Sequence, residues 1–590
     1  MAMRISTKTD KPKDAVGALK RLLKYCLNYK YRLCMIVILC LVSNALALTG
    51  PKLAGNAIEE ISNGAGRINM HIVIHYVKLM ICCYAMSAIL SYIVSVTMMK
   101  TGRLVALRMR EDVFNKLMTL PVGFFDRNQA GDIISRVSYD IDVISTSIST
   151  DTIQILTSLF TVVGSFCMMF LISPWLVLIT LITIPLAVGY TKLMGQKTRP
   201  LFSKRSAKYG QMNGFVEEMF SGQKTILAYG REDKVTENFD KINNEAAELF
   251  YKSEYYGMTI GPSVGFINNL GLALTCMCGS VLYLYKIVNL GEISSFVLYT
   301  RKFSGPINEI ANIINDLFSA LAASERVFRL LDEEEEIEDI DGAIELKDVR
   351  GDVKFDHVKF SYEKGRTIIN DFTLFVPSGE LVAIVGKTGA GKTTLINLLM
   401  RFYDVDEGHI YVDGKEIRSL TRKSLRRAYA MVLQDTWVFE GTVFDNIAYG
   451  CENATRKDVI EAAKSAHIHS FITHLPKGYD TIISEDGGNI SKGQKQLLTI
   501  ARAFLYDASI LILDEATSNV DTTTEQEIQK AMTQLMKGRT CFVIAHRLST
   551  IQSADNILFI DHGDIIEQGT HRQLMDQKGR YYDMYMSQWQ

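Results

Sequence analysis

Gly386-Lys387-Thr388-Gly389-Ala390-Gly391-Lys392-Thr393-Thr394 is the stretch of sequence that decides the fold of the C-terminal half of this chain. It matches G-x-x-x-x-G-K-[ST], the pattern of a phosphate-binding loop. Residues 381–385 before it form an apolar run that predicts a buried strand, and residues 395–400 after it have the apolar character of a helix. Strand, glycine-rich loop and helix is the context that the motif requires, so we predict a nucleotide site here.

The residue types in this loop each have a physical role. Glycines let backbone N–H groups turn toward phosphate oxygens without a side chain in the way. The following helix directs its positive end at the same phosphates. Lys392 is expected to reach the β- and γ-phosphates, and the hydroxyl of Thr393 is expected to bind Mg²⁺.

Length and composition bound the rest of the chain. At 590 residues the chain exceeds one ordinary hydrophobic core, so at least two domains are expected. The net charge of −1 gives no indication of a nucleic-acid partner. A hydrophobic content of 48% together with 22% charged residues indicates that apolar and charged sequence are segregated along the chain.

The first half of the chain has the pattern of a membrane domain. Uncharged or nearly uncharged runs occupy residues 33–48, 77–99, 153–171, 175–190 and 257–285, and a weaker run begins near residue 293. With extension beyond the shorter runs, each is about long enough to cross a hydrocarbon core of ~30 Å. Lysine and arginine are concentrated in alternate connections, and basic connections remain in the cytoplasm. We therefore predict a multi-pass protein of the cell membrane with six spans, and with both termini and the C-terminal domain in the cytoplasm.

The two cytoplasmic connections are long and contain few prolines, so we expect the membrane helices to continue into the cytoplasm and turn at residues 124–132 and 217–222. Ahead of the first span, apolar residues among the lysines of 18–27 predict an amphipathic helix on the membrane surface. Arg301 and Lys302 fall within the sixth span. They either line a water-filled cavity or lie at a helix end and extend toward the interface.

An acidic segment separates the two halves. Residues 332–341 hold eight acids in ten positions, which predicts a solvated linker. From residue 351 onward, short β-rich runs give way to alternating strands and helices. We therefore predict a transmembrane domain over 1–330, a linker over 331–346 and an α/β nucleotide-binding domain over 347–590.

A second strand-like run, residues 510–513, ends in Asp514 and Glu515. Downstream of a phosphate-binding loop, an acid in the position of Asp514 is expected to hold Mg²⁺ through water. Glu515 is placed to polarise an attacking water as general base. Two carboxylates at a solvent-facing strand end are the alternative, and the loop upstream favours the catalytic interpretation.

Five further motifs accompany the loop and the two carboxylates. Tyr362 follows Phe360-Ser361, Gln434 lies in Met431-Val432-Leu433-Gln434-Asp435, Ser491-Lys492-Gly493-Gln494 precedes Asp514, and Ser518-Asn519-Val520-Asp521 and His546 follow it. In this order they resemble the adenine-stacking aromatic, glutamine loop, signature, aspartate loop and switch histidine of ATP-binding-cassette proteins. The six-span domain, with Phe125-Asp126 and Gly131-Asp132 in its first cytoplasmic turn, resembles the exporter branch of that family.

The resemblance implies a multi-domain fold. It consists of an N-terminal all-α six-helix transmembrane domain with long cytoplasmic helix extensions, and a C-terminal α/β P-loop ATPase domain with a helical subdomain. It also implies ATP and Mg²⁺ as ligands. The resemblance implies catalytic roles for Glu515, His546 and Gln434, and metal binding by Thr393, Gln434 and Asp514. It implies nucleotide binding by Tyr362, Gly386, Lys387, Thr388, Gly389, Ala390, Gly391, Lys392, Thr393, Thr394, Ser491, Gly493, Gln494 and Asp521.

In this family each ATP site is closed by the signature of a second nucleotide-binding domain, and this sequence contains one such domain. The resemblance therefore implies a half-transporter that dimerises. The signature departs from the family pattern Leu-Ser-Gly-Gly-Gln, because Lys492 replaces the first glycine, whereas Glu515 is intact. This combination resembles the glutamate-bearing subunit of bacterial heterodimeric multidrug-type exporters, whose partner has an intact signature and no catalytic glutamate. A homodimer with a tolerated signature variant remains the alternative.

The function implied is ATP-driven export of a small amphipathic substrate such as a drug, a lipid or a peptide, by alternating access. A homodimeric lipid flippase, an ATP-gated channel and an importer on the exporter plan are the alternatives.

Overall fold

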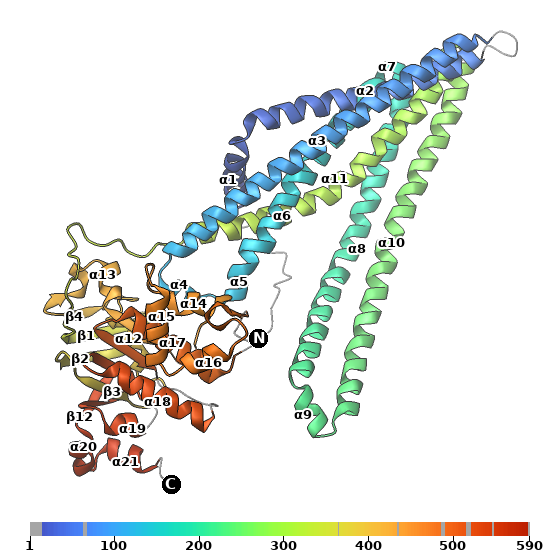
Figure 1. The fold of residues 1–590 in the computed structure, drawn as a ribbon. Coiled ribbons are helices and arrows are strands. Elements are labelled where there is room, and N and C mark those ends of the chain that lie inside the picture. The colour runs from blue at the N-terminus through green and yellow to red at the C-terminus, as the bar shows by residue number, and fades with distance from the viewer. Residues whose placement is uncertain are drawn as a thin grey trace. The chain divides into compact units, whose positions relative to one another are not determined.

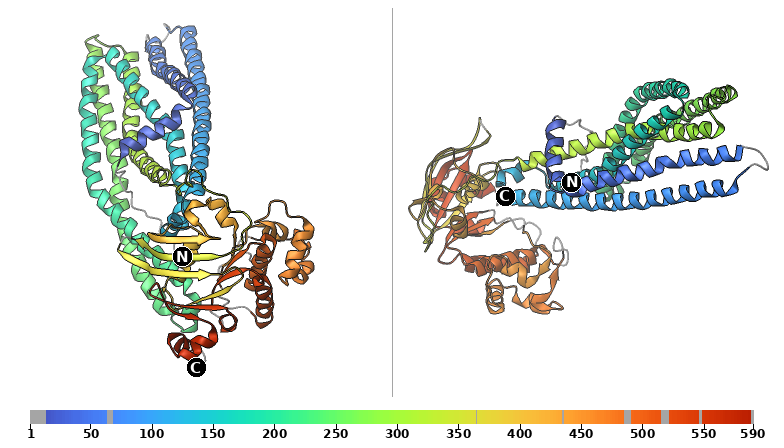
Figure 2. Two further views of the ribbon diagram at one scale, coloured as in Figure 1. Left: turned by 90° about the vertical axis from the view of Figure 1, so that its left-hand side faces the viewer. Right: turned by 90° about the horizontal axis from the view of Figure 1, so that it is seen from above.

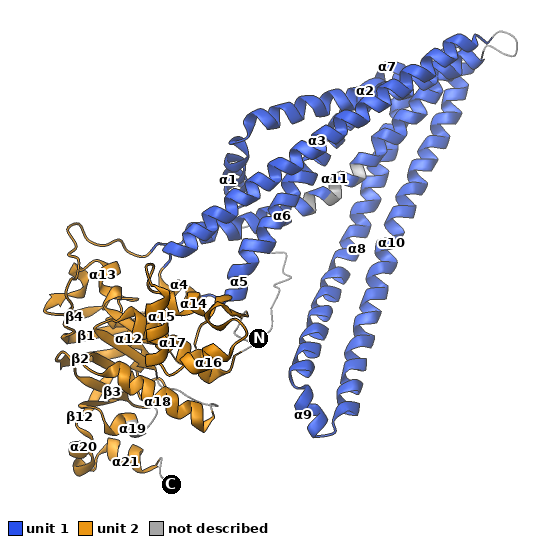
Figure 3. Cartoon of the chain, viewed as in Figure 1, with its two compact units in different colours: residues 1–120, 128–335 blue, residues 121–127, 336–590 orange. Residues whose placement is uncertain are grey.

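A computed structural model describes residues 14–62, 68–363, 365–433, 436–484, 490–514, 521–545 and 548–587. The chain divides into two compact units (Figure 3). A helical unit comprises residues 1–120 and 128–335, and a nucleotide unit comprises residues 121–127 and 336–590. The short segment 121–127 belongs to the second unit although the chain on both sides of it belongs to the first.

The helical unit is built from long helices (Figure 1). These are α2 (Lys30–Ser62), α3 (Met70–Thr119), α7 (Thr152–Ile172), α8 (Pro174–Ser221), α10 (Glu232–Leu284) and α11 (Leu290–Leu331). Between α3 and α7 the chain passes through α4 (Val122–Arg127), α5 (Ala130–Ser135), the π-helical η1 (Arg136–Asp140), α6 (Ile141–Thr146) and the π-helical η2 (Ser147–Asp151). The short α9 (Gln223–Ala228) joins α8 to α10, which run side by side (Figures 1 and 2). The first turn, near residues 120–130, overlaps the predicted stretch 124–132. The second, near residues 222–231, begins at the end of the predicted stretch 217–222, because α8 continues to Ser221.

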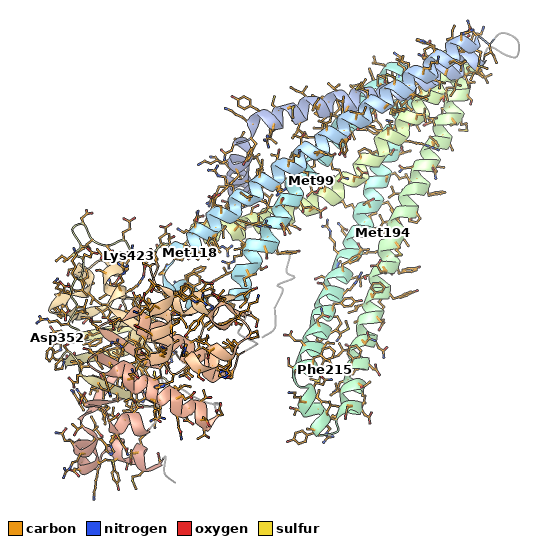
Figure 4. All side chains as sticks on the ribbon, in the orientation of Figure 1. Met99, Met118, Met194, Phe215, Asp352 and Lys423 are labelled. Carbon is orange, nitrogen blue, oxygen red and sulfur yellow. The ribbon has the colours of Figure 1, made fainter. Side chains whose placement is uncertain are left out.

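Five of the described helical stretches are long and apolar enough to cross a membrane, namely Lys30–Ser62, Met70–Thr119, Ala130–Ile172, Pro174–Ser221 and Glu232–Leu284. Their outward faces are apolar, with Ile182 72% exposed on α8 and Phe266 68% exposed on α10. Figure 4 draws the side chains of this helix pair and labels Met194 and Phe215 on α8, both of which are half-buried. Exposed apolar surface of this extent fits contact with lipid. Helix α11, which carries Arg301 and Lys302, is not among the five, so the sixth span stays a prediction.

Helix α11 packs closely on α2. The backbone of Gly291 approaches α2 so tightly that a Cβ atom there would lie 2.2 Å from the carbonyl oxygen of Gly55. The Nζ of Lys302 donates to the carbonyl of Ala47 at 3.0 Å, and the hydroxyl of Tyr299 donates to that of Leu48 at 2.5 Å. Lys302 is therefore held by a neighbouring helix, whereas Arg301 is exposed.

The predicted amphipathic helix is α1 (Ala15–Leu27). One face packs on protein, since Leu22 is buried, and the hydroxyl of Tyr25 donates to Asp112 of α3 at 2.7 Å. Leu23 and Leu27 are exposed on the remaining surface. These leucines are available for the membrane contact that the sequence predicts.

The nucleotide unit contains a six-stranded sheet in the order β12-β11-β3-β10-β9-β6. Strands β3 (Leu381–Val385), β6 (Tyr429–Val432), β9 (Ile510–Asp514), β10 (Thr540–Ile544) and β11 (Asn556–Asp561) are parallel, and β12 (Asp564–Gly569) is antiparallel. A four-stranded antiparallel sheet has the order β2-β1-β4-β5, with β1 (Val353–Glu363), β2 (Arg366–Val376), β4 (Glu407–Val412) and β5 (Lys415–Glu416). Strands β7 (Gly441–Thr442) and β8 (Ile482–Ile483) pair separately. The parallel strands are near-continuous apolar runs because both of their faces are covered.

Helices cover these sheets and form two apolar cores. One core combines β3, β9 and β10 with α12 (Lys392–Leu399), α13 (Arg422–Arg427) and the antiparallel sheet. The other combines the opposite faces of the same strands with α14 (Val443–Ala448), α15 (Arg456–Ser465), α16 (His469–His474), α17 (Lys492–Tyr506) and α18 (Thr522–Met536). Helices α19 (Leu548–Gln552), α20 (His571–Gln577) and α21 (Arg580–Ser587) complete the unit, together with the 3₁₀ turns η3 (Ile417–Ser419) and η4 (Gly478–Asp480). The predicted α/β domain with a helical part is thus observed.

The acidic segment differs from the predicted solvated linker. Glu336 lies 2.5 Å from Arg426 and Asp339 lies 3.2 Å from Arg422, and both arginines belong to α13. Arg422 is 7% exposed. A guanidinium group that is buried to this degree needs an anionic partner, and the linker supplies it.

Candidate functional site

The phosphate-binding loop lies between β3 and α12, as the sequence predicts. Gly386 approaches another strand so closely that a Cβ atom would lie 2.1 Å from the carbonyl oxygen of Ile560 in β11. Gly391 has φ of 102°, a left-handed value that favours glycine, and α12 begins at the next residue. These two positions require glycine for steric reasons that are independent of any ligand. They direct the loop across the carboxyl end of the parallel sheet.

The side chain of Lys392 folds back over the loop. Its Nζ donates to the carbonyl oxygens of Gly386 at 2.7 Å and Lys387 at 2.9 Å. Burial lowers the pKa of Lys392 below its usual value, and the charge of Asp514 partly opposes this shift. A cation that is desolvated and held mainly by neutral carbonyls fits a phosphate group as its partner. The exposed hydroxyl of Thr393 and the carboxylate of Asp514 are the hard oxygen donors that Mg²⁺ prefers.

The strand register places Asp514 near the loop. Strand β10 lies between β3 and β9, and Ile544 pairs with Ile384 on one side and with Asp514 on the other. Asp514 therefore lies at the same end of the sheet as the loop, which is where ligands bind in parallel α/β sheets. Three predicted catalytic residues, Gln434, Glu515 and His546, and residues 518–520 of the predicted aspartate loop, lie outside the described residues.

Tyr362 is positioned beside the loop by the antiparallel sheet. It is 44% exposed, and its hydroxyl donates to the Oγ1 of Thr394 at 3.3 Å and accepts from the Nδ2 of Asn397 at 3.2 Å. The hydroxyl is thus fixed on α12 while the ring remains open on one side. This arrangement suits the predicted stacking on a base. Asn397 was not among the predicted residues.

The predicted signature forms the start of α17. Ser491 is the N-cap, its Oγ accepts from the backbone N–H of Gln494 at 3.2 Å, and the Oε1 of Gln494 accepts from the N–H of Ser491 at 2.8 Å. This reciprocal pair is a capping box. Gly493 is buried, whereas Lys492 is exposed at the first position of the helix. The departure from the family signature thus places a cation on the surface.

Asp521 is the N-cap of α18. Its carboxylate accepts from the N–H of Thr524 at 3.0 Å, and this hydrogen bond is the first cause that lowers the pKa of Asp521. Residues of the predicted signature and aspartate loop therefore also stabilise helix ends. Ser and Asp three residues before a backbone donor are a recognisable capping signal, so the sequence could have indicated this second role.

Comparison with known proteins identifies the family. Residues 33–307 match the model described as ABC transporter transmembrane region, and residues 369–518 match the ABC transporter model. The chain is 40% identical over 583 residues to the uncharacterized ABC transporter ATP-binding protein YfiC of Bacillus subtilis, covering 99% of this chain and 96% of that protein. The chain belongs to the ATP-binding cassette transporter family.

Other members extend this relationship. The chain is 44% identical over 477 residues to the fatty acid ABC transporter ATP-binding/permease protein of Mycobacterium bovis, covering 81% of this chain and 75% of that protein. It is 33% identical over 577 residues to the ATP-dependent lipid A-core flippase of Syntrophus aciditrophicus, covering 96% and 94%. A bacterial Atm1-family ABC exporter with ATP bound has a similar structure, with a TM-score of 0.75, 29% identity, and coverage of 95% of this chain and 98% of that one. This ABC exporter chain therefore couples ATP hydrolysis to transport across a membrane, and ABC exporters work as dimers.

Proposed function

We propose that this chain is one half of a dimeric ATP-driven exporter of the cell membrane, with the nucleotide unit in the cytoplasm, and that its substrate is a lipid-like amphiphile. The observation that carries the ATP-driven part is the Lys392 ammonium group, desolvated and held by loop carbonyls beside Asp514. The names of two relatives, a fatty acid transporter and a lipid A-core flippase, support a lipid-like substrate. We also propose three functional parts of the chain, namely a transmembrane domain over residues 1–330, a linker over 331–346 and a nucleotide-binding domain over 347–590.

In the proposed site, Tyr362 stacks on adenine, residues 386–394 hold the phosphates, and Thr393, Asp514 and Gln434 serve Mg²⁺. Mg²⁺ would neutralise charge on the transferred phosphoryl group. Glu515 acts as the general base, and Gln434 and His546 contact the attacking water and the γ-phosphate. Ser491, Gly493, Gln494 and Asp521 face a nucleotide held by the other chain of the dimer.

A transport assay tests the exporter proposal. The chain, alone or with its partner, is reconstituted in liposomes, and ATP hydrolysis is measured together with movement of a fluorescent fatty acid and a fluorescent phospholipid. Glu515→Gln should abolish both hydrolysis and movement, whereas Glu527→Gln, an exposed glutamate on α18, should leave both unchanged. Movement that persists in Glu515→Gln with ATP bound would favour a channel. Substrate that moves toward the side of the nucleotide units would favour an importer.

We further propose an asymmetric heterodimer. Lys492 is exposed at the start of α17, where a partner's phosphate would bind, and a long cationic side chain there replaces the glycine of the usual signature. In a heterodimer, the site closed by Lys492 contains the partner's nucleotide and lacks a catalytic glutamate. Lys492→Gly should then leave ATP turnover unchanged.

The second candidate is a homodimeric lipid flippase, which the similarity to the lipid A-core flippase over 96% of this chain favours. In a homodimer both sites contain Lys492, so Lys492→Gly should change turnover. Native mass spectrometry of the chain expressed alone gives a second readout. A stable homodimer with two equivalent hydrolytic sites would refute the heterodimer.

A further inference from the structure

The nucleotide unit contains a cavity of about 740 Å³ that is separate from the phosphate-binding loop. Ala428 and Ser509 line it and come directly before β6 and β9, so the cavity lies at the amino ends of these parallel strands. The phosphate-binding loop follows β3 at the opposite, carboxyl end of the sheet. A cavity of this volume is in the usual range for sites that hold a small organic molecule.

Hydrogen bonds hold the apolar wall of this cavity in place. Leu346 and Ala428, which belong to the wall, are buried. The backbone N–H of Leu346 donates to Oγ of Ser424 at 3.0 Å. Oγ of Ser509 donates to the carbonyl oxygen of Val349 at 2.7 Å. The wall is therefore formed without a ligand, so a ligand does not have to order it on binding.

The polar part of the cavity contains two hydrogen-bond donors, the guanidinium group of Arg427 and the hydroxyl of Tyr506. Burial raises the pKa of Tyr506 and of the Cys451 thiol, and the charge of Arg427 opposes both shifts, so the guanidinium lies near both groups. Tyr506 therefore stays protonated and remains a donor. Its ring packs on the backbone of Gly450, where a Cβ atom would lie 2.7 Å from Cδ2 of the ring. Within the parts of the chain that the structure describes, neither donor side chain has a hydrogen bond or an ion pair.

The acidic side chains around the cavity limit the charge of a ligand. Asp458, Asp507 and Glu452 line it, and Asp507 already binds Arg539 at 2.5 Å. Among the described residues that line the cavity, Arg427 is the one cation. A ligand with a single negative charge can pair with it, whereas a second negative charge would be repelled by the carboxylates. The apolar wall favours an apolar part beside the charged group.

We propose that this cavity binds a small organic monoanion, whose carboxylate accepts hydrogen bonds from Arg427 and Tyr506. Its apolar part lies against Leu346 and Ala428. Hydrogen bonds from a guanidinium group to a carboxylate are stronger than those between neutral groups, so Arg427 provides most of the affinity. The lining also includes residues 450–454 between α14 and α15, so the ligand contacts the helical part of the nucleotide unit as well as the strand ends. The inference does not depend on the proposed transport function.

Fluorine NMR tests the inference with 4-fluorobenzoate as the probe. The full chain, with its partner if it needs one, is placed in phosphatidylcholine nanodiscs, and the Kd is obtained from the broadening of the probe resonance as protein is added. In Arg427→Gln the Kd should rise on the order of tenfold or more, because a hydrogen bond between two charged groups is lost. In Tyr506→Phe, which keeps the ring, it should rise roughly threefold.

A control variant and two further probes make the test specific. Lys423→Gln is the matched control, because Lys423 is exposed on the same helix and does not line the cavity (Figure 4), and it should leave the Kd unchanged. The uncharged 4-fluorobenzamide and, at pH 8, the dianion 4-fluorophenyl phosphate should both bind more weakly than 4-fluorobenzoate. The inference is overturned if the original protein shows no saturable binding, or if Arg427→Gln and Lys423→Gln have the same Kd. Tighter binding of the amide or the phosphate would overturn the assignment to a monoanion.

Discussion

Lys302 binds a carbonyl group that Pro51 leaves without its usual helical partner, so Lys302→Met should destabilise the helical unit. Proline has no N–H, and the carbonyl of Ala47 is the group that a residue at position 51 would otherwise bind. Nζ of Lys302 donates to this oxygen at 3.0 Å, and the ring of Tyr84 lies 5.8 Å from the same Nζ. Methionine keeps much of the apolar length of the side chain and removes the donor.

The expected cost follows from the kind of bond that is lost. Hydrogen bonds between membrane helices contribute about 0.6 kcal/mol on average and up to about 1.7 kcal/mol. A charged donor and a desolvated carbonyl favour the upper part of this range, so we expect a loss of about 1–2 kcal/mol. Pro51→Ala restores an N–H to the Ala47 carbonyl. In that background the cost of Lys302→Met should fall, which gives a coupling of about 1 kcal/mol in a double-mutant cycle.

The assay measures the free energy of unfolding by titrating SDS into the protein in micelles of a single mild detergent. It compares the original protein, Lys302→Met, Pro51→Ala and the double variant. Arg301→Met is the matched control, because this neighbouring cation is exposed and its loss should cost less than about 0.5 kcal/mol. Strictly additive costs for Lys302→Met and Pro51→Ala would refute the assignment of Lys302 to the proline break.

Three further predictions concern single side chains. Asp140→Asn should destabilise the protein by about 2 kcal/mol, because the carboxylate is 4% exposed and accepts two hydrogen bonds from Arg326, at 2.9 and 2.6 Å. Asp142 is the control, because its carboxylate also binds an arginine at 2.6 Å but is 67% exposed. Asp142→Asn should lower the free energy of unfolding by less than about 1 kcal/mol when both variants are compared by thermal unfolding. Equal losses of stability in the two variants would contradict this account. Tyr362→Ala should raise the Kd for ATP roughly 10- to 100-fold in equilibrium titrations, as expected for loss of base stacking, and Tyr362→Phe should restore most of the affinity. Hydrogen bonds from the first turn of α18 lower the pKa of Asp521. The stability that this cap contributes is therefore fully present above the ordinary carboxyl pKa of about 4, and it is lost as the pH falls through the lower pKa of the folded state. Asp521→Asn should reduce the loss of unfolding free energy that acid causes in this pH range, measured by thermal unfolding at a series of pH values.

The local architecture of the nucleotide site was predictable because its signals are contiguous in sequence. The apolar run of β3, the glycines and the apolar stretch of α12 occupy the consecutive residues 381–399, and each element specifies its neighbour. The six-stranded sheet then brings Asp514 to the same edge through strand pairing. The length and low proline content of the two cytoplasmic connections likewise predicted helices that continue past the membrane and turn at residues 124–132 and 217–222. The first predicted turn overlaps the observed one, whereas the second observed turn lies a few residues later, after α8 ends at Ser221.

Contacts between distant segments were not predictable from the sequence. Tyr403 and Asp126 are 277 positions apart, and Lys302 and Ala47 are 255 positions apart. Tyrosine in a short loop after a helix carries no local signal of its partner, and a lysine in a weakly apolar helix is compatible with a cavity or an interface. Pro51 was a usable signal in retrospect. A proline inside a membrane helix releases one carbonyl, which a neighbouring helix commonly satisfies.

The acidic linker shows why a charge run cannot be assigned from composition alone. Eight acids in ten positions predict mutual repulsion and solvation only if no cations face them. Here Glu335 binds Lys116 of α3 at 2.8 Å within the helical unit, and the next residue, Glu336, binds Arg426 of α13 within the nucleotide unit. Consecutive residues of the acidic run therefore bind cations of different units. Arg426 lies 90 positions from Glu336, so the composition of the acidic run contains no local signal of this partner.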